Sequence, residues 1–178
     1  LSHLDGLCHT YIDVDANKEM AINIVLNAKM RRTGVCGATE TLLCHKDVII
    51  NILPDIINKL IEQGCEIRAD KNIKVLNHNI KNATIEDWQT EYLDKILSIK
   101  TVENVSDAVN HIEKFGSNHT DAIITDNKKT AEIFLKEVNS AIVLHNASTQ
   151  YADGGEFGMG AEMGIATGRL HARGPVGL

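Results

Sequence analysis

The stretch HTYIDVDANKEMAINIVLNAKMRRTGVCGATETLLCH, residues 9–45, decides the fold class of this 178-residue chain. Residues 9–14 and 41–45 have the composition of strands, and residues 20–28 between them place their apolar side chains on one helical face. Asp15 is the expected cap of that helix. Two strands joined by an amphipathic helix are typical of a parallel sheet flanked by helices.

The same alternation continues along the rest of the chain. Apolar runs predict further strands at 65–68, 96–102, 122–125 and 141–144. Helices are predicted over 49–61, where Pro54 favours a kink or a later start, over 106–115, and after Asp126, where Leu135 falls on the predicted buried face. Residues 70–88 are polar and predicted to be irregular. The predicted fold class is therefore α/β, a single domain with a three-layer, mostly parallel sheet flanked by helices.

Composition excludes several classes of partner. A net charge of -6 and only 4% aromatic residues argue against a nucleic-acid-binding face. The longest apolar runs are far shorter than the roughly 20 residues that cross a bilayer, and the sequence shows no signal-peptide pattern. The four cysteines form no CxxC pair and the eight histidines show no paired ligand spacing, so we expect no metal site and no disulfide framework. Reduced thiols favour a cytoplasmic protein.

The segment from Asn146 to Leu178 is rich in glycine and shows no clear helical or strand period. Long loops of this kind often carry function, so we expect a surface that faces a ligand or a partner. Its glycines do not have the spacing of a nucleotide-binding GxGxxG turn.

Cys36 is the cysteine with the most reactive surroundings. It lies in RRTGVCGAT (residues 31–39), between a predicted helix and a predicted strand, among glycines and beside two arginines. Nearby cations favour the thiolate, which is the nucleophilic form. A free cysteine is also a common small apolar core residue, and that interpretation stays open for Cys36 and is favoured for Cys8, Cys44 and Cys65.

Five blocks of the sequence resemble one enzyme family. NAKMRRTGVCGATET (residues 27–41) resembles the catalytic-cysteine segment of the gamma-glutamyl phosphate reductases, also called glutamate-5-semialdehyde dehydrogenases, of the aldehyde dehydrogenase superfamily. The other blocks are HLDGLCHTYIDVDA (3–16), EDWQTEYLDKILSIK (86–100), the run around HIEKFGSNHTDAI (111–123) and VLHNASTQYADGGEFGMGAEMGIATGRLHARGPVGL (143–178). The resemblance spans nearly the whole chain and implies an aldehyde-dehydrogenase-like catalytic domain.

The resemblance also implies an activity and a set of site residues. The family reduces gamma-glutamyl phosphate to glutamate-5-semialdehyde with NADPH, a step of proline biosynthesis, through a thioester on the cysteine that corresponds to Cys36. It further implies that Glu91 holds the nicotinamide ribose and that Asn146, Ser148 and Thr149 belong to the substrate loop. His119 is expected near the same cleft.

Three departures from the family pattern bear on this chain. The family's KTQRP before the cysteine becomes KMRRT (residues 29–33). The family's NASTRF becomes NASTQY (residues 146–151), so Gln150 replaces an arginine that could clamp an anion. Family members are also more than twice as long. We therefore expect residues 1–178 to be the cysteine-bearing domain alone, without the N-terminal cofactor-binding domain and the closing C-terminal strand.

Three functions stay open at this point. The chain is part of a split or fragmented reductase, a non-catalytic remnant, or a binding module for a partner chain or a gamma-glutamyl ligand. Taken alone it is expected neither to bind NADPH nor to reduce the acyl phosphate. The expected partners are the small-molecule substrate, a separate cofactor-domain chain and a second copy, which would pair through an exposed apolar surface around the cleft.

Overall fold

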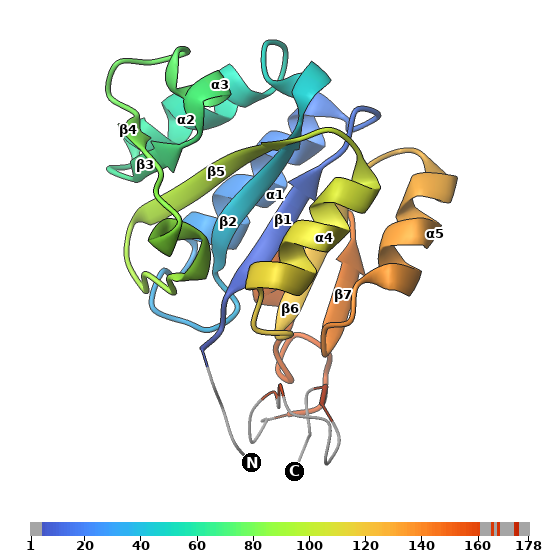
Figure 1. The fold of residues 1–178 in the computed structure, drawn as a ribbon. Helices are drawn as coiled ribbons and strands as arrows, with labels where there is room; N and C mark the ends of the chain where they lie inside the picture. The colour runs from blue at the N-terminus through green and yellow to red at the C-terminus, as the bar shows by residue number, and fades with distance from the viewer. Residues whose placement is uncertain (1–4, 161–164, 166, 168–172, 175–178) are drawn as a thin grey trace.

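The computed structural model describes residues 5–160, 165, 167, 173 and 174, and its centre is a seven-stranded sheet (Figure 1). The strands are β1 (Cys8–Ile12), β2 (Thr39–His45), β3 (Glu66–Ala69), β4 (Lys81–Asn82), β5 (Ile96–Val102), β6 (Thr120–Ile124) and β7 (Ile142–His145). Their order across the sheet is β4-β3-β5-β2-β1-β6-β7, and each pair of neighbours is parallel. The predicted α/β class is therefore confirmed, with a sheet that is parallel throughout this part of the chain.

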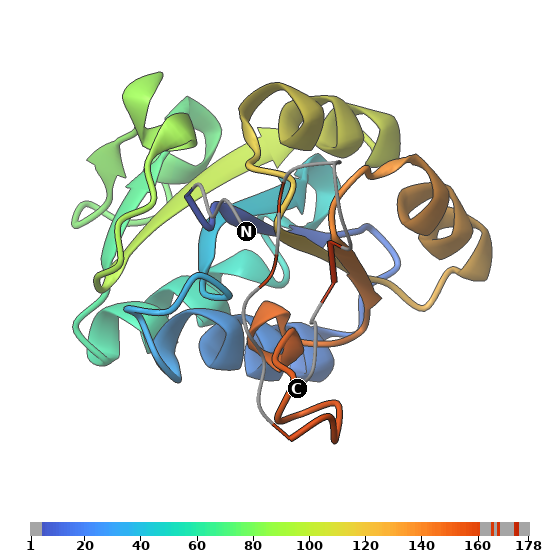
Figure 2. The same ribbon diagram turned by 90° about the horizontal axis from the view of Figure 1, so that it is seen from below.

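Helices cover both faces of the sheet. They are α1 (Lys18–Met30), α2 (Leu53–Glu62), α3 (Lys71–Lys74), α4 (Val105–Phe115) and α5 (Lys128–Glu137), with 3-10 turns η1 (Lys46–Val48), η2 (Glu86–Gln89) and η3 (Thr149–Tyr151). Figure 2 shows α1 and α2 on one face and α4 and α5 on the other. One apolar core lies under α1 and α2, with Leu42 and Ile57 at its centre, and a second lies under α4 and α5, around Tyr11 and Phe134.

The helix caps differ from the predicted ones by one or two residues. Asn17, not Asp15, caps α1 by accepting a hydrogen bond from the Met20 amide at 3.0 Å. Asn127, not Asp126, caps α5. Each Asn side chain accepts from the second or third amide of its helix, the position that a cap must reach. The prediction that Leu135 is buried was wrong: its side chain is 42% exposed.

Residues 70–88 are more ordered than the sequence predicts. Asp70 caps the short helix α3. Its carboxylate also accepts a hydrogen bond from the backbone amide of Thr101 in the neighbouring strand β5. Trp88 in η2 is buried. Pro54 lies in the first turn of α2, where its missing amide costs no hydrogen bond, so the predicted later start of that helix is confirmed. None of the helices within the described ranges is long and apolar enough to cross a membrane.

Candidate active site

The loops that carry Cys36, Glu91 and His119 all lie at the amino ends of the strands. Cys36 precedes β2, Glu91 precedes β5 and His119 precedes β6. Because these strands are parallel and adjacent to one another or to β1, the three loops share one edge of the sheet (Figure 1). Open α/β sheets usually bind ligands at the opposite, carboxyl edge, so general topology alone would not have found this site.

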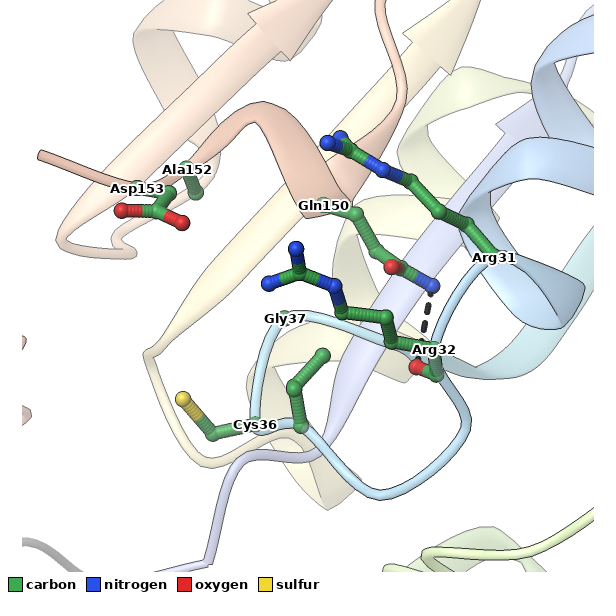
Figure 3. Close-up of a pocket in the computed structure, with 8 residues that line it drawn as sticks. Arg31, Arg32, Cys36, Gly37, Gln150, Ala152 and Asp153 are labelled. Atoms are coloured by element: carbon green, nitrogen blue, oxygen red, sulfur yellow. Dashed lines mark hydrogen bonds between the residues drawn. The ribbon is translucent and has the colours of Figure 1, made fainter. Parts of the chain in front are cut away.

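Cys36 lies in the wall of a pocket of about 180 Å³ at this edge (Figure 3). The lining residues come from the loop before β2 and from the segment after β7: Arg31, Arg32, Val35, Cys36, Gly37, Gln150, Ala152 and Asp153. Cys36 is half-buried, so it is not a sealed core residue. Gln150, Ala152 and Asp153 of the segment after β7 thus line the same pocket as the Cys36 thiol.

Close backbone contacts hold the Cys36 loop in place. A turn joins the Ala38 amide to the Val35 carbonyl at 2.9 Å. A Cβ built on Gly37 would lie 3.2 Å from the Thr149 carbonyl oxygen, and one built on Gly6 would lie 2.5 Å from the Cys36 Cβ. Both neighbours therefore approach so closely that only glycine fits there without a shift.

The other three cysteines are buried and free. Burial raises the pKa of the Cys65 thiol to about 12 and raises the pKa of the Cys8 and Cys44 thiols still more clearly. Cys8 nevertheless contributes to the site, because its thiol donates to the Cys36 carbonyl at 3.0 Å. The structure thus agrees with a structural role for these three thiols and adds a supporting contact that the sequence did not indicate.

Gln150, which replaces the family's arginine, faces the protein backbone. Its side-chain amide is buried and donates to the carbonyl oxygens of Ala28 at 2.9 Å and Arg32 at 3.1 Å. These two carbonyls belong to the last turn of α1 and to the residue four positions before Cys36. A neutral side chain at position 150 therefore ties the end of α1 to the segment after β7.

Ser148 and Thr149 are also buried and bonded within the protein. The Ser148 hydroxyl accepts from the Gln150 amide at 3.2 Å and so caps η3. The Thr149 hydroxyl lies 2.9 Å from that of Thr39, which in turn lies 2.7 Å from the Thr10 hydroxyl. These contacts fix the segment after β7 against the first two strands.

Asn146 and His119 lie outside the lining of the Cys36 pocket. The Asn146 side chain bonds both backbone groups of Thr125, accepting from its amide at 2.9 Å and donating to its carbonyl at 3.0 Å. His119 is buried, with Nδ1 3.5 Å from the Cys8 sulfur and 3.0 Å from the Thr120 hydroxyl. His119 thus contacts Cys8, which in turn donates to the Cys36 carbonyl.

A buried ion pair lies between the Cys36 loop and the Glu91 segment. Lys29 at the end of α1 donates to Glu40 at the start of β2 over 2.6 Å, and both side chains are 0% exposed. The other oxygen of Glu40 accepts from the Leu93 amide at 3.2 Å. Burial raises the pKa of Glu40 to about 7, although Lys29 acts in the opposite direction. Glu40, a carboxylate without a predicted partner, therefore connects the two loops.

The described residues do not form a dinucleotide cradle. Glu91 is half-buried, and one carboxylate cannot bind a dinucleotide by itself. The connection between β1 and α1, residues 13–17, contains no glycine, so it cannot form the glycine-rich turn that binds a pyrophosphate. Within the same ranges no group of three histidine, cysteine or acidic side chains could hold a metal ion. The residues present therefore do not fit a whole NADPH molecule.

The sheet, its helices and the pocket cysteine define an aldehyde-dehydrogenase-like α/β domain. A crystal structure of an acetylating aldehyde dehydrogenase from Geobacillus thermoglucosidasius shares this fold, with a TM-score of 0.71 and 16% identity over 96% of this chain and 47% of that one. No family model matches the chain.

The sequence identifies the relatives more narrowly. The chain is 58% identical over 177 residues to the gamma-glutamyl phosphate reductase of Parvibaculum lavamentivorans and 56% identical to that of Bartonella quintana. A crystal structure of the Thermotoga maritima gamma-glutamyl phosphate reductase superposes with a TM-score of 0.95 at 43% identity, covering 98% of this chain and 42% of that one. The chain is thus homologous to one part of the gamma-glutamyl phosphate reductases, and the resemblance found in the sequence is confirmed. The chain spans about two-fifths of the length of these curated relatives.

Proposed function

We propose that this chain carries the acyl-transfer half of a gamma-glutamyl phosphate reductase, with Cys36 as the nucleophile. The observation that carries the proposal is the contrast among the four cysteines. Cys36 alone of them is half-buried and lines a pocket, while burial raises the thiol pKa of Cys8, Cys44 and Cys65. The 58% identity to a relative named for this activity supports the choice of substrate.

In the proposed step the Cys36 thiolate attacks the acyl carbon of gamma-glutamyl phosphate. A carbon–sulfur bond forms, the bond from that carbon to the phosphate oxygen breaks, and phosphate leaves with the electron pair. The product is a gamma-glutamyl thioester on Cys36. In this proposal Ser148 and Thr149 fix the backbone of the pocket wall, and His119 supports the Cys36 loop through Cys8. Asn146 acts at a distance from the pocket, by holding the start of the segment after β7 against Thr125.

Reduction of the thioester by NADPH, the step that would serve proline biosynthesis, is proposed for the whole enzyme. Glu91 is the residue of this chain that we propose to contact the nicotinamide ribose, since it lies at the same sheet edge as Cys36. The rest of the cofactor site is proposed to come from the portion of the reductases that this chain does not span.

The first test is brief alkylation of the purified chain with iodoacetamide at neutral pH, followed by mass mapping of the modified peptides. We expect Cys36 to be labelled first, and the Cys44→Ser variant to be labelled at the same rate because Cys44 is buried. Preferential labelling of Cys8, Cys44 or Cys65 would refute the proposal.

The second test separates the two half-reactions. An acyl-phosphate probe such as acetyl phosphate should leave an acyl group on Cys36 that hydroxylamine, which cleaves thioesters, removes. The Cys36→Ser variant should carry no such hydroxylamine-labile group. The same chain should show no turnover of glutamate semialdehyde with NADP. Turnover by the chain alone would overturn the assignment of the cofactor site to the missing portion.

The segment after β7 also exposes apolar side chains that could contact another polypeptide. Tyr151, Phe157 and Met159 are 45%, 47% and 50% exposed, and they belong to the segment after β7 that also contributes Gln150, Ala152 and Asp153 to the Cys36 pocket. We propose that these exposed side chains pack against the remainder of the reductase and, in its absence, against a second copy of the chain. Light scattering should therefore show dimers, and a monomer at high concentration would contradict this part of the proposal.

A further inference from the structure

Two adjacent arginines line the Cys36 pocket, and the structure distinguishes them. Arg31 donates to Glu156 at 2.5 Å, so its charge is already matched by a carboxylate. Arg32 makes no ion pair and no side-chain hydrogen bond within residues 5–160, the continuous part of the chain that the structure describes. Figure 3 shows the Arg31 guanidinium turned away from Cys36 and the Arg32 guanidinium extending between Gly37 and Gln150 toward the pocket.

The other polar side chains of the pocket do not offer a place for an anion. The amide hydrogens of Gln150 go to two backbone carbonyls, so this residue has none to give to a ligand. Asp153 is an anion itself, and its carboxylate accepts from the Gly155 amide at 2.9 Å. Arg32 is therefore the pocket's available cation, and Gln150 holds its backbone in place.

We propose that Arg32 binds the phosphoryl group that leaves when Cys36 is acylated; this rests on the function proposed above. The phosphoryl group is attached to the carbon that Cys36 attacks, so an anion site on the same pocket wall as the thiol suits it. A guanidinium matches two phosphoryl oxygens with paired hydrogen bonds and remains charged as negative charge develops on the leaving oxygen. The family that the sequence resembles carries an arginine at position 150. In this chain Gln150 instead donates to the backbone carbonyls of Ala28 and Arg32.

The experiment compares the alkylation rates of Cys36 with iodoacetate, an anion, and iodoacetamide, its neutral analogue. The ratio of the two rates reports the local positive charge, whereas a change in thiol exposure moves both rates together. We expect the Arg32→Gln variant to lower the ratio about threefold, the order of magnitude for removing one unit charge near the thiol in water. The control is the double variant Arg31→Gln/Glu156→Gln, which removes the neighbouring ion pair without a change in net charge and should keep the ratio.

A second readout uses inorganic phosphate as the probe. Phosphate at constant ionic strength should slow the reaction of iodoacetamide with Cys36 in a saturable manner, and Arg32→Gln should abolish that protection. Acetate under the same conditions should protect weakly. Equal protection by phosphate in Arg32→Gln, or equal protection by acetate in the unmodified chain, would overturn the assignment to the phosphoryl group.

The two proposals can fail separately. If Cys36 is not the first thiol to react, the proposed function fails. If Cys36 reacts first but Arg32→Gln leaves both the rate ratio and the phosphate protection unchanged, only the role of Arg32 fails. Because Arg32 is exposed, we expect its variants to fold, and near-ultraviolet circular dichroism checks that.

Discussion

The two ends of strand β2 carry the same kind of ion pair in opposite surroundings. At the amino end Lys29 and Glu40 lie 2.6 Å apart and are 0% exposed. Directly after the carboxyl end Lys46 and Glu103 lie 2.6 Å apart with side chains 50% and 64% exposed. The distance is the same, so the difference in burial decides what each pair can do.

The buried pair stands beside the Cys36 loop, and the exposed pair is on the other edge of the sheet. Glu40 also accepts from Leu93, whose φ of 52° is in the left-handed region that a leucine rarely adopts. A buried network of this kind determines one arrangement of the loops, because any other arrangement leaves a charge without a partner in the interior. The amino end of β2 is therefore rigid where the chemistry is proposed.

The largest expected effect comes from breaking the buried pair. Lys29→Met leaves Glu40 without its cation inside the protein and should lower the free energy of unfolding by about 3 kcal/mol. The double variant Lys29→Met/Glu40→Gln removes both charges and keeps an acceptor for Leu93, so it should recover at least half of that loss. Urea denaturation followed by circular dichroism measures both, and a double variant no better than Lys29→Met would contradict the electrostatic explanation.

The same pair should make stability depend on pH, by up to about 3 kcal/mol. The folded-state pKa of Glu40 is raised from 4.5 to about 7, so between these values the folded state binds more protons than the unfolded state. Stability attributable to Glu40 therefore falls as the pH rises from 4.5 through about 7 and levels off about one unit above that value.

Burial lowers the pKa of His111 to about 2, which acts on stability in the opposite direction below pH 6.5. The test is thus the difference in urea midpoint between the unmodified chain and Lys29→Met/Glu40→Gln, measured at pH 5, 6, 7 and 8. A difference that does not change with pH would show that Glu40 keeps one protonation state in this range.

A smaller loss of stability is expected from Gly37→Ala, a variant in the loop before the amino end of β2. Its new Cβ would lie 3.2 Å from the Thr149 carbonyl oxygen, which is tighter than an ordinary contact, so the variant should lose about 1 kcal/mol of stability. Gly34→Ala is the matched control in the same loop, because nothing lies within 4 Å of a Cβ at Gly34. Equal thermal shifts for the two variants would show that the contact with Thr149 can relax.

The smallest effect should come from the carboxyl end of β2. Lys46→Met removes an exposed charge from a solvent-screened pair and should leave the free energy of unfolding nearly unchanged. Alkylation of Cys36 should proceed at its ordinary rate in this variant. A loss comparable to that of Lys29→Met would remove the contrast between the two ends.

Much of the fold was predictable because parallel strands are buried on both faces and appear as short apolar runs. β2, β5 and β6 follow from such runs, as do α4 and α5 from their periodicity. The caps were displaced because Asp15 and Asn17, like Asp126 and Asn127, can all cap a helix. Tertiary contacts decide between them, such as the one between the Asn127 amide group and the Asp15 carboxylate.

The site was predictable where its signal is local. Cys36 stands among glycines and arginines, and that pattern is visible within nine residues. The role of Gln150 depends on Ala28 and Arg32, more than 110 residues earlier in the chain. The distinction between Arg31 and Arg32 depends on Glu156, which is equally remote. No local pattern encodes such contacts, so only the three-dimensional structure separates the two arginines.

The strand order has a consequence for how the chain folds during synthesis. β1 is synthesised before both of its neighbours, and it pairs with β2 on one side and with β6, residues 120–124, on the other. Until β6 has left the ribosome, β1 presents an open strand edge with apolar residues on both faces, a template for pairing with another chain. Distant pairing of this kind also slows folding. A ribosome-bound chain that stops before residue 120 should therefore depend on chaperones, and one that has released β6 should not.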